Sequence, residues 1–233
     1  MKSLPLRALP RVFVPGAAPD DIIDLPSAEV DKLRKVLRLS AGAQIGVLPD
    51  DGTLIQCEFT GRDARPLQVH RPDVEPEIEL TILQALPKGD KMDEIIRACT
   101  EIGVSKFVLF PSERTVVKWD DKKTVDRLQR LSTIAKEAAE VCFRTRLPKI
   151  QYAQSLKEVI KLHQDALFLS ESEREFKTLP KTGKPLALGV GPEGGWSPSE
   201  LVLIGDRGVT LGPRILRVDH AAAAAAAILL LSS

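Results

Sequence analysis

The chain has 233 residues, a formal net charge of +1, 43% hydrophobic residues and 28% charged residues. These values are ordinary for a globular protein and allow one large or two small domains. The charge balance gives no general support for a nucleic-acid partner, so any basic surface has to be local. The N-terminus has no signal-peptide pattern and the apolar run 221–231 is too short to span a bilayer, so we expect a cytoplasmic protein.

The cysteines and histidines indicate neither a metal site nor a hydrolase. Cys57, Cys99 and Cys142 are far apart in the sequence, and the chain has no C-x-x-C, H-E-x-x-H or G-x-S-x-G pattern. We therefore expect buried thiols, no disulfide framework and no metal ion.

Residues 11–71 are short apolar stretches divided by turn formers, a pattern typical of a small β-rich unit. The Asp51-Gly52 pair between "IGVL" and "LIQCEF" predicts a β-hairpin, because these residue types accept the backbone angles of a tight turn. Segment 71–79, "RPDVEPEIE", is rich in proline and acidic residues and predicts a linker or domain edge.

From residue 80 the pattern changes to strands that alternate with longer helices. A helix is expected to start at an Asp90 cap and end at Gly103. The alternation predicts a mainly parallel α/β sheet, whose ligands bind at the carboxyl ends of the strands. Strands are predicted at 80–86, 106–110, 165–170, 186–190 and 209–212, and a long helix at about 122–143.

The segment "GVGPEGGWSPSE", 189–200, predicts a strand, a glycine turn and a helix. Ser197 followed by Pro198 and by Glu200 is a capping box at a helix start. The spacing of the glycines matches neither a dinucleotide loop nor a phosphate loop, and Glu193 is a poor neighbour for phosphate. Two interpretations remain, a tight connection and a small-molecule site in which glycines let a ligand approach the main chain.

The last predicted helix starts near Asp219 and contains seven alanines, 221–227. Alanine favours helix and adds almost no bulk, so another backbone can approach closely. Close packing inside a tight fold or against a second subunit is the preferred interpretation, and a helix former at a chain end is the alternative.

Three blocks together resemble one family. They are "LPKGDKMDEIIRACTEIGVSKFVLFPSERTVVK" at 86–118, "GVGPEGGWSPSE" at 189–200 and "LGPRILRVDHA" at 211–221. Their order and spacing are similar to those of the RsmE-type 16S ribosomal RNA (uridine-N3) methyltransferases of the SPOUT superfamily. The stretches at 11–15 and 35–52 resemble the N-terminal RNA-binding domain of that family.

The resemblance implies an α/β protein with a PUA-like β-barrel that binds RNA, 1–73, and a SPOUT methyltransferase domain with a C-terminal trefoil knot, 76–233. It also implies S-adenosylmethionine as cofactor, 16S ribosomal RNA in the small subunit as partner, and a homodimer. The implied cofactor-binding residues are Leu169, Leu188, Gly189, Gly191, Pro192, Glu193, Gly194, Gly195, Leu211, Gly212, Arg214, Ile215 and Leu216.

Methylation of uridine N3 requires that the N3 proton leaves and that the resulting anion is stabilised. The resemblance implies Asp219 as proton acceptor, and Arg217 and Arg144 as groups that stabilise charge. Asp219 is also a candidate N-cap of the alanine helix, and isolated arginines are often only surface charge. The residues expected to bind RNA are Arg11, Arg34, Lys35, Arg38, Lys88, Lys91, Arg114 and Arg146.

The chain departs from the family pattern at several positions. Val218, Asp219 and His220 replace the usual Thr-Glu-Thr, and Lys32 stands at a usual histidine. Val141 and Phe143 replace Gln and Gly in the long helix region. Two other functions therefore stay open, a SPOUT methyltransferase with another RNA target and an inactive ribosome assembly factor.

Overall fold

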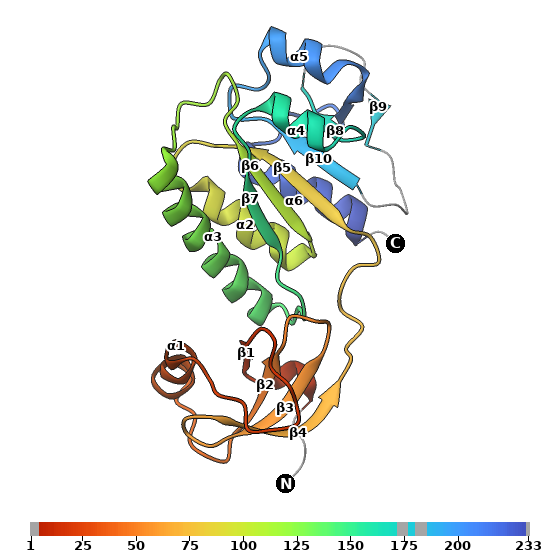
Figure 1. The fold of residues 1–233 in the computed structure, drawn as a ribbon. Coiled ribbons are helices and arrows are strands. Elements are labelled where there is room, and N and C mark those ends of the chain that lie inside the picture. Colours follow the sequence, from red (N-terminus) through yellow and green to blue (C-terminus); the bar gives the residue numbers. More distant parts are fainter. Residues whose placement is uncertain (1–4, 172–176, 180–185, 232–233) are drawn as a thin grey trace. The chain divides into compact units, whose positions relative to one another are not determined.

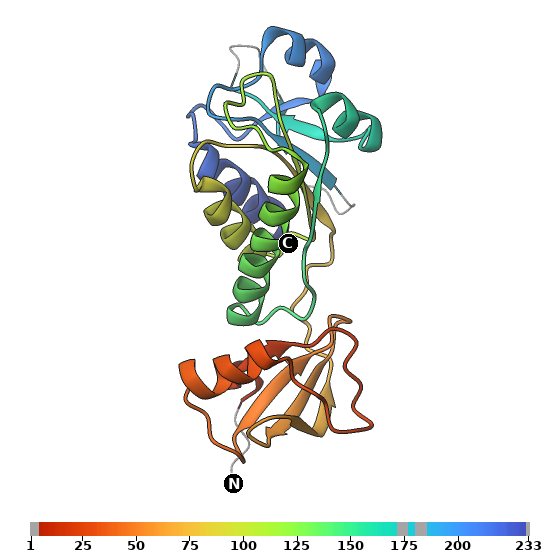
Figure 2. The same cartoon turned by 60° about the vertical axis from the view of Figure 1, so that its left-hand side comes forward.

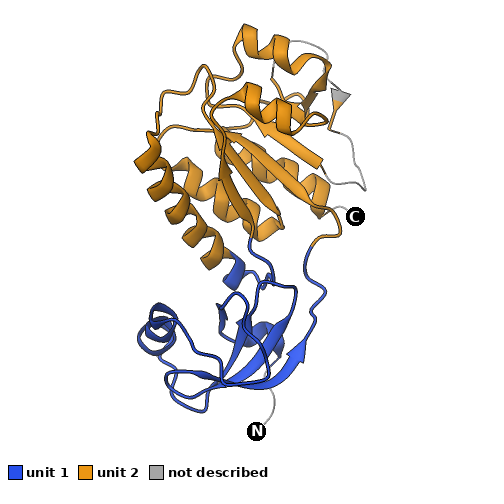
Figure 3. Ribbon diagram, in the orientation of Figure 1, with its two compact units in different colours: residues 1–75, 139–147 blue, residues 76–138, 148–233 orange. Residues whose placement is uncertain are grey.

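The structure is a computed structural model that describes residues 5–171, 177–179 and 186–231 (Figure 1). The chain divides into two compact units (Figure 3). The first contains Met1–Glu75 and Ala139–Leu147, and the second contains Pro76–Ala138 and Pro148–Ser233. Among the described helices, none combines the length and the apolar character that a membrane span needs.

The first unit is built on a mixed four-stranded sheet in the order β1-β2-β3-β4. Strand β1 pairs parallel with β2, and the other two pairs are antiparallel. The predicted hairpin at Asp51-Gly52 is confirmed, with Asp50 at φ 70° and Gly52 at φ 97° in the turn. The elements are β1 (Arg11–Phe13), α1 (Ser27–Asp31) with a following π-helical turn (Lys32–Val36), β2 (Gln44–Leu48), β3 (Leu54–Phe59) and β4 (Ala64–His70).

Beyond the sheet, one isolated bridge joins Ile23 to Ala64. The strand pairings within the described residues form an open sheet, so the closed barrel stays a prediction.

Segment 139–147 is an integral part of the first unit, which the sequence did not indicate. Ala139 and Phe143 pack in one apolar cluster with Phe13 and Leu48. Phe143 has a φ of 69°, an uncommon backbone conformation for a bulky residue, at a place where the family pattern has glycine. The packing of this segment therefore holds Phe143 in a backbone conformation that is costly for a bulky residue.

The second unit has a parallel seven-stranded sheet in the order β7-β6-β5-β10-β8-β11-β9, as the alternating pattern predicted. The elements are β5 (Leu80–Ala85), α2 (Lys91–Ile102), β6 (Lys106–Phe110), α3 (Asp121–Val141), β7 (Lys149–Tyr152), α4 (Leu156–Leu162), β8 (Leu167–Leu169), β9 (Lys177–Thr178), β10 (Leu186–Val190), α5 (Pro198–Ile204), β11 (Gly208–Thr210) and α6 (Val218–Leu230).

Helices cover both faces of this sheet (Figure 2). One face packs against α2, α3 and α6, and the opposite face packs against α4 and α5. Adjacent residues of β5 point to opposite faces, with Ile82 in the first core and Leu83 in the second, because side chains alternate along a strand. A fully covered parallel sheet explains why its strands read as continuous apolar runs.

Both ends of α2 lie where the sequence predicted them, with Asp90 in the N-cap position and Gly103 at the C-terminal end. Gly103 ends the helix in a left-handed conformation with φ 112°, as expected for a C-terminal glycine. Asp90 precedes the helix, but its side chain makes no capping hydrogen bond. Its backbone, at φ −96° and ψ 10°, is not extended as in a typical N-cap.

The alanines of α6 pack within the chain. Ala222, Ala225 and Ala226 are fully buried, and α6 lies against α2, β5 and β10. Close packing inside the fold is therefore confirmed as one reason for the alanine run.

Candidate functional site

A cavity of about 650 Å³ lies in the second unit, at the carboxyl ends of β10 and β8. Strand β10 leads into the loop Gly191–Gly195, here called the GPEGG loop, and a second wall comes from Ile215 to Val218 before and within α6. Its position agrees with the rule that ligands of parallel sheets bind beyond the carboxyl ends of strands.

Eight of the residues predicted to bind a cofactor line this cavity, namely Leu169, Gly191, Pro192, Glu193, Gly194, Gly195, Ile215 and Leu216. Five others are not part of its lining, namely Leu188, Gly189, Leu211, Gly212 and Arg214. Lys91, Arg114 and Arg217, which were predicted for other roles, also line it.

Gly189 is a packing glycine. A Cβ atom at this position would lie 2.2 Å from a ring carbon of Phe168, which is buried on the neighbouring strand β8. Leu188, before it, is fully buried in the core. The sheet interior therefore explains these two residues without a ligand.

The GPEGG loop turns tightly at its end. Gly195 has φ 64° and donates its N–H to the Pro192 carbonyl at 2.9 Å. A Cβ atom at Gly195 would meet open space, whereas one at Gly191 would lie 3.2 Å from the Trp196 ring. Gly195 thus serves the turn conformation, and Gly191 serves the close approach of the indole.

Trp196 is the main cavity residue that the sequence analysis missed. Its indole N–H donates to the Leu169 carbonyl at 2.7 Å, and its ring stacks on Phe110 with centroids 6.4 Å apart. These contacts tie the loop after β10 to the end of β8. The sequence signal that could have identified Trp196 is an aromatic residue directly after the glycines of the loop. The other cavity residues that were missed are Ser170, Glu171, Val190, Pro198, Leu201, Val218 and Ala221.

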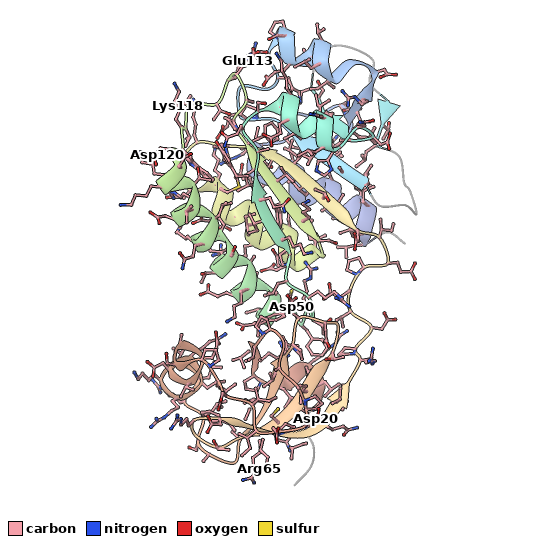
Figure 4. The ribbon with its side chains drawn as sticks, in the orientation of Figure 1. Asp20, Asp50, Arg65, Glu113, Lys118 and Asp120 are labelled. Carbon is pink, nitrogen blue, oxygen red and sulfur yellow. The ribbon has the colours of Figure 1, made fainter. Side chains whose placement is uncertain are left out.

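The capping box at α5 is confirmed. Ser197 accepts the Glu200 backbone N–H, and the Glu200 carboxylate accepts the Ser197 N–H at 2.9 Å. The buried Glu200 carboxylate also accepts the backbone N–H of Glu113 at 2.9 Å. Glu113, labelled in Figure 4, is in the loop after β6, so the cap also holds that loop.

The side chain of Glu193 points to the start of α2. Its carboxylate accepts the Lys88 backbone N–H at 3.0 Å and the Lys91 ammonium at 2.6 Å. Partial burial raises the pKa of Glu193, but the hydrogen bond from Lys91 and the backbone N–H donors outweigh it, and the pKa lies below its ordinary value. Glu193 is therefore an ionised loop anchor.

Asp219 and Arg217 form an ion pair beside the cavity. Arg217 Nε donates to Asp219 Oδ1 at 3.1 Å, and a second guanidinium nitrogen lies 3.1 Å from Oδ2. Arg217 is 70% exposed and Asp219 17%. Partial burial raises the pKa of Asp219, but the hydrogen bond and charge of Arg217 and the backbone N–H of Asp219 together outweigh it, and the pKa is lowered.

The capping alternative for Asp219 is wrong. Helix α6 starts at Val218 with Arg217 in the N-cap position, so Asp219 lies inside the first turn. A residue inside the turn cannot take the N-cap geometry, and α6 has no side-chain capping bond.

The chain matches the family described as RNA methyltransferase domain over residues 74–230. It is 34% identical over 214 residues to a ribosomal RNA small subunit methyltransferase E of Bacillus subtilis, with 83% of each chain covered. The chain belongs to the ribosomal RNA small subunit methyltransferase E family. A family member from Synechocystis is 33% identical over 219 residues, which are 86% of this chain and 71% of that one.

Solved structures of methyltransferases share the fold. A ribosomal RNA small subunit methyltransferase E from Neisseria gonorrhoeae, bound to S-adenosylmethionine, is 27% identical with a TM-score of 0.84, covering 94% of this chain and 96% of that one. A methyltransferase of Legionella pneumophila with bound S-adenosylmethionine is 25% identical with a TM-score of 0.85 and the same coverage. These likenesses confirm the α/β fold expected for the methyltransferase E family.

Arg144, predicted as catalytic in this methyltransferase E chain, is buried in the first unit. Its guanidinium donates to the Glu75 carboxylate at 2.9 and 3.1 Å, and the Thr145 N–H donates to the same carboxylate at 2.7 Å. Arg146 donates to the Asp51 carbonyl at 2.6 Å. Both arginines hold segment 139–147, and their roles toward uridine or RNA stay predictions.

Arg11 is also engaged inside the first unit. Its guanidinium donates to the Glu140 carbonyl at 2.8 Å and lies over the Phe143 ring, 4.8 Å from the centroid. An arginine with several protein acceptors has few donors left for phosphate, so its RNA contact has weak structural support.

The other predicted RNA contacts of the first unit are exposed. Arg34 and Lys35 belong to the π-helical turn and Arg38 follows it with φ 54°. Lys35 pairs with Asp31 at 2.9 Å, an exposed pair of the kind that contributes little to stability. These three cations are available to a polyanion.

Proposed function

We propose that this chain uses S-adenosylmethionine to methylate N3 of a specific uridine in the 16S ribosomal RNA of the small subunit. The observation that carries the proposal is the 650 Å³ cavity at the GPEGG loop in a chain of the methyltransferase E family. The relative from Neisseria gonorrhoeae was solved with that cofactor. Small-subunit RNA as partner implies work in the cytoplasm.

The residues present fit the cofactor. The cavity volume is in the range of small-molecule sites. Apolar side chains such as Leu169 and Leu216 line it, and the glycines of the GPEGG loop bring main-chain groups to its edge. When bound, S-adenosylmethionine supplies an electrophilic methyl group, so no metal and no covalent enzyme intermediate is needed.

The Arg217–Asp219 pair is our proposal for the proton and charge chemistry. The Asp219 carboxylate is ionised at neutral pH and therefore has a lone pair that can accept the N3 proton, while the ion pair with Arg217 that lowers its pKa makes it a weaker base. Arg217, exposed at the cavity edge, stabilises negative charge on the uracil oxygens. A base paired inside folded RNA has to be flipped out to reach the cavity.

We assign RNA docking to a PUA-like barrel domain, residues 1–73, and catalysis to residues 76–233. The proposed C-terminal trefoil knot is supported by the chain path, because α6 follows β11 yet packs against β5 and β10, on the other side of β8.

A homodimer is part of the proposal. A closed two-fold pair would bring residues of one subunit, such as those near Arg144, to the cavity of the other. Exposed apolar side chains remain beside the site, among them Ile215 at 75% exposure. A mass of one chain by light scattering at micromolar concentration, with full activity, would contradict the dimer.

The deciding experiment is nucleoside analysis of 16S ribosomal RNA from a deletion strain, with restoration by the purified protein on small subunits. We expect 3-methyluridine at one position to disappear and to return only with S-adenosylmethionine. A different methylated nucleoside would indicate another RNA target. Unchanged RNA, in a protein that binds no cofactor by calorimetry, would indicate an assembly factor.

A further inference from the structure

Two cations that line the cavity, Lys91 and Arg114, donate hydrogen bonds to acceptors on the GPEGG loop. Lys91 Nζ is 2.6 Å from Glu193 Oε1, and an Arg114 guanidinium nitrogen is 2.6 Å from the Gly194 carbonyl oxygen. We propose that Lys91 and Arg114 are positioning residues that hold the GPEGG loop in its cofactor-binding shape, and that neither binds RNA phosphate. This inference rests on the proposed function.

The first contact joins the loop to α2. The Glu193 carboxylate accepts the Lys88 backbone N–H through both oxygens, at 3.0 and 3.3 Å, as well as the Lys91 ammonium. The side chains of Lys91 and Glu193 are 31% and 23% exposed. An ion pair this exposed is weak by itself, but the backbone N–H and the helix N-terminus favour the same anion.

The second contact comes from the loop after β6. The stem of Arg114 lies over Gly194, where a Cβ atom would be only 3.4 Å from Arg114 Cβ and Cδ. The residue before Arg114 is itself held, because the Glu113 N–H donates to buried Glu200 and the Glu113 carboxylate accepts from Ser199 Oγ at 2.7 and 2.8 Å. Arg114 therefore reaches Gly194 from a fixed base.

The loop between these contacts needs such support. Gly191, Gly194 and Gly195 lie within five residues, and glycine has the largest conformational freedom of any residue. A loop that samples several shapes binds its ligand with an affinity reduced by the fraction of the competent shape. Contacts from two sides raise that fraction, and their loss lowers cofactor affinity through the shape of the loop.

The test is calorimetry of S-adenosylmethionine on the full chain with Lys91→Met and Arg114→Met. We expect the Kd to rise about tenfold or more in each variant, with melting temperatures near that of the wild type. Matched controls are Lys123→Met and Arg97→Met, which remove exposed pairs with Asp120 and Glu94. The controls should stay within about twofold of the wild type. Lys91→Arg, which keeps the charge, should recover most of the affinity.

Three further measurements separate loop support from phosphate binding. The KM for S-adenosylmethionine should rise while kcat at saturation stays near the wild-type value. Lys91→Met combined with Glu193→Gln should weaken cofactor binding no more than the stronger single variant, because the two residues act together. The slope of log Kd against log salt for an rRNA fragment should be unchanged.

An unchanged cofactor Kd in the folded Lys91→Met and Arg114→Met variants overturns the inference. A salt slope reduced by about one overturns it as well, because that is the loss expected for one phosphate contact. If the wild-type chain itself binds no S-adenosylmethionine, the proposed function fails instead, so the two failures are distinguishable.

Discussion

At the scale of single residues, several of the predicted functional side chains make hydrogen bonds or ion pairs within the protein. Glu75 takes donors from Arg144 and Thr145, and Glu193 takes donors from Lys88 and Lys91. A carboxylate with several donors is satisfied where it is partly buried, and it orders the segments that supply the donors. Residue type alone therefore does not separate a ligand-binding cation from a structural one.

Asp219→Asn tests the proposed base. The amide still accepts a hydrogen bond from Arg217 but is not basic, so we expect single-turnover methylation to fall by about two or more orders of magnitude. The melting temperature should change little, because Asp219 makes no cap. An active Asp219→Asn enzyme would show that the proton leaves by another route, such as His220, whose ring nitrogen is 3.9 Å from Asp219 Oδ2.

Lys32→Met tests a buried charge. Lys32 pairs with the Glu140 carboxylate, which also accepts the Phe13 N–H at 2.9 Å and is 5% exposed. Burial raises the pKa of Glu140, and the hydrogen bonds from Lys32 and Phe13 offset part of that rise. Without Lys32 the carboxylate loses its cation, so we expect a loss of about 1–3 kcal/mol at pH 7.5.

The pH dependence of the Lys32→Met effect follows from the direction in which the pKa of Glu140 is shifted. A raised pKa means that the folded state favours protonated Glu140, so the stability linked to protonation is present below the ordinary pKa and is lost as pH rises. The difference in the free energy of unfolding between Lys32→Met and the wild type, measured by urea unfolding, should therefore be smaller at pH 5 than at pH 7.5. Lys35→Met, which removes an exposed pair with Asp31, should show no such gap. A gap that widens in acid would contradict this account.

At the scale of elements, α6 shows how small side chains let a helix pack closely. Ala222, Ala225 and Ala226 are fully buried, and α2 lies against this helix. The buried alanines of this run thus serve interior packing.

Ala222→Leu tests this packing. Three added carbon atoms have no space in the closely packed interior, so we expect a loss of about 1–3 kcal/mol in the free energy of unfolding. Ala224, on the half-exposed side of α6, is the matched position, and Ala224→Leu should change stability far less. Urea unfolding of both variants checks this, and equal losses would argue against the described packing.

At the scale of the whole molecule, the two units carry different functional features, a cavity in one and a group of exposed cations in the other. Within the described part of the chain, the cavity is lined by residues of the second unit, and the exposed cations Arg34, Lys35 and Arg38 belong to the first. This division agrees with one unit that binds cofactor and another that contacts RNA.

A triple variant, Arg34→Ala with Lys35→Ala and Arg38→Ala, tests this division. We expect weaker binding of an rRNA fragment and a salt slope reduced by up to about two to three, with the cofactor Kd unchanged. Arg62→Ala with Arg65→Ala removes exposed cations from the same unit, with Arg65 labelled in Figure 4, and serves as control. Equal losses in both variants would indicate only a general effect of charge.

The sequence by itself determined the features that depend on near neighbours. The hairpin at Asp51-Gly52, the glycine end of α2, the capping box at Ser197 and the parallel α/β pattern were all predicted correctly. Each follows from steric limits or hydrogen bonds within a few residues, or from the period of apolar side chains along one element. The family motif at 189–200 likewise predicted the cavity loop, because that loop is one contiguous stretch of sequence.

Only the tertiary structure decided which distant side chains meet. Glu193 reaches Lys91 across 102 positions, Arg144 reaches Glu75 across 69, and Gly189 faces Phe168 from a neighbouring strand. The contacts of Glu193 and Gly189 depend on the strand order β5-β10-β8-β11, which places segments far apart in the chain side by side, and the Arg144 contact depends on the place of segment 139–147 in the first unit. No local pattern encodes these arrangements, so the sequence alone did not show that Lys91 and Arg144 contact protein carboxylates or that Gly189 packs against Phe168.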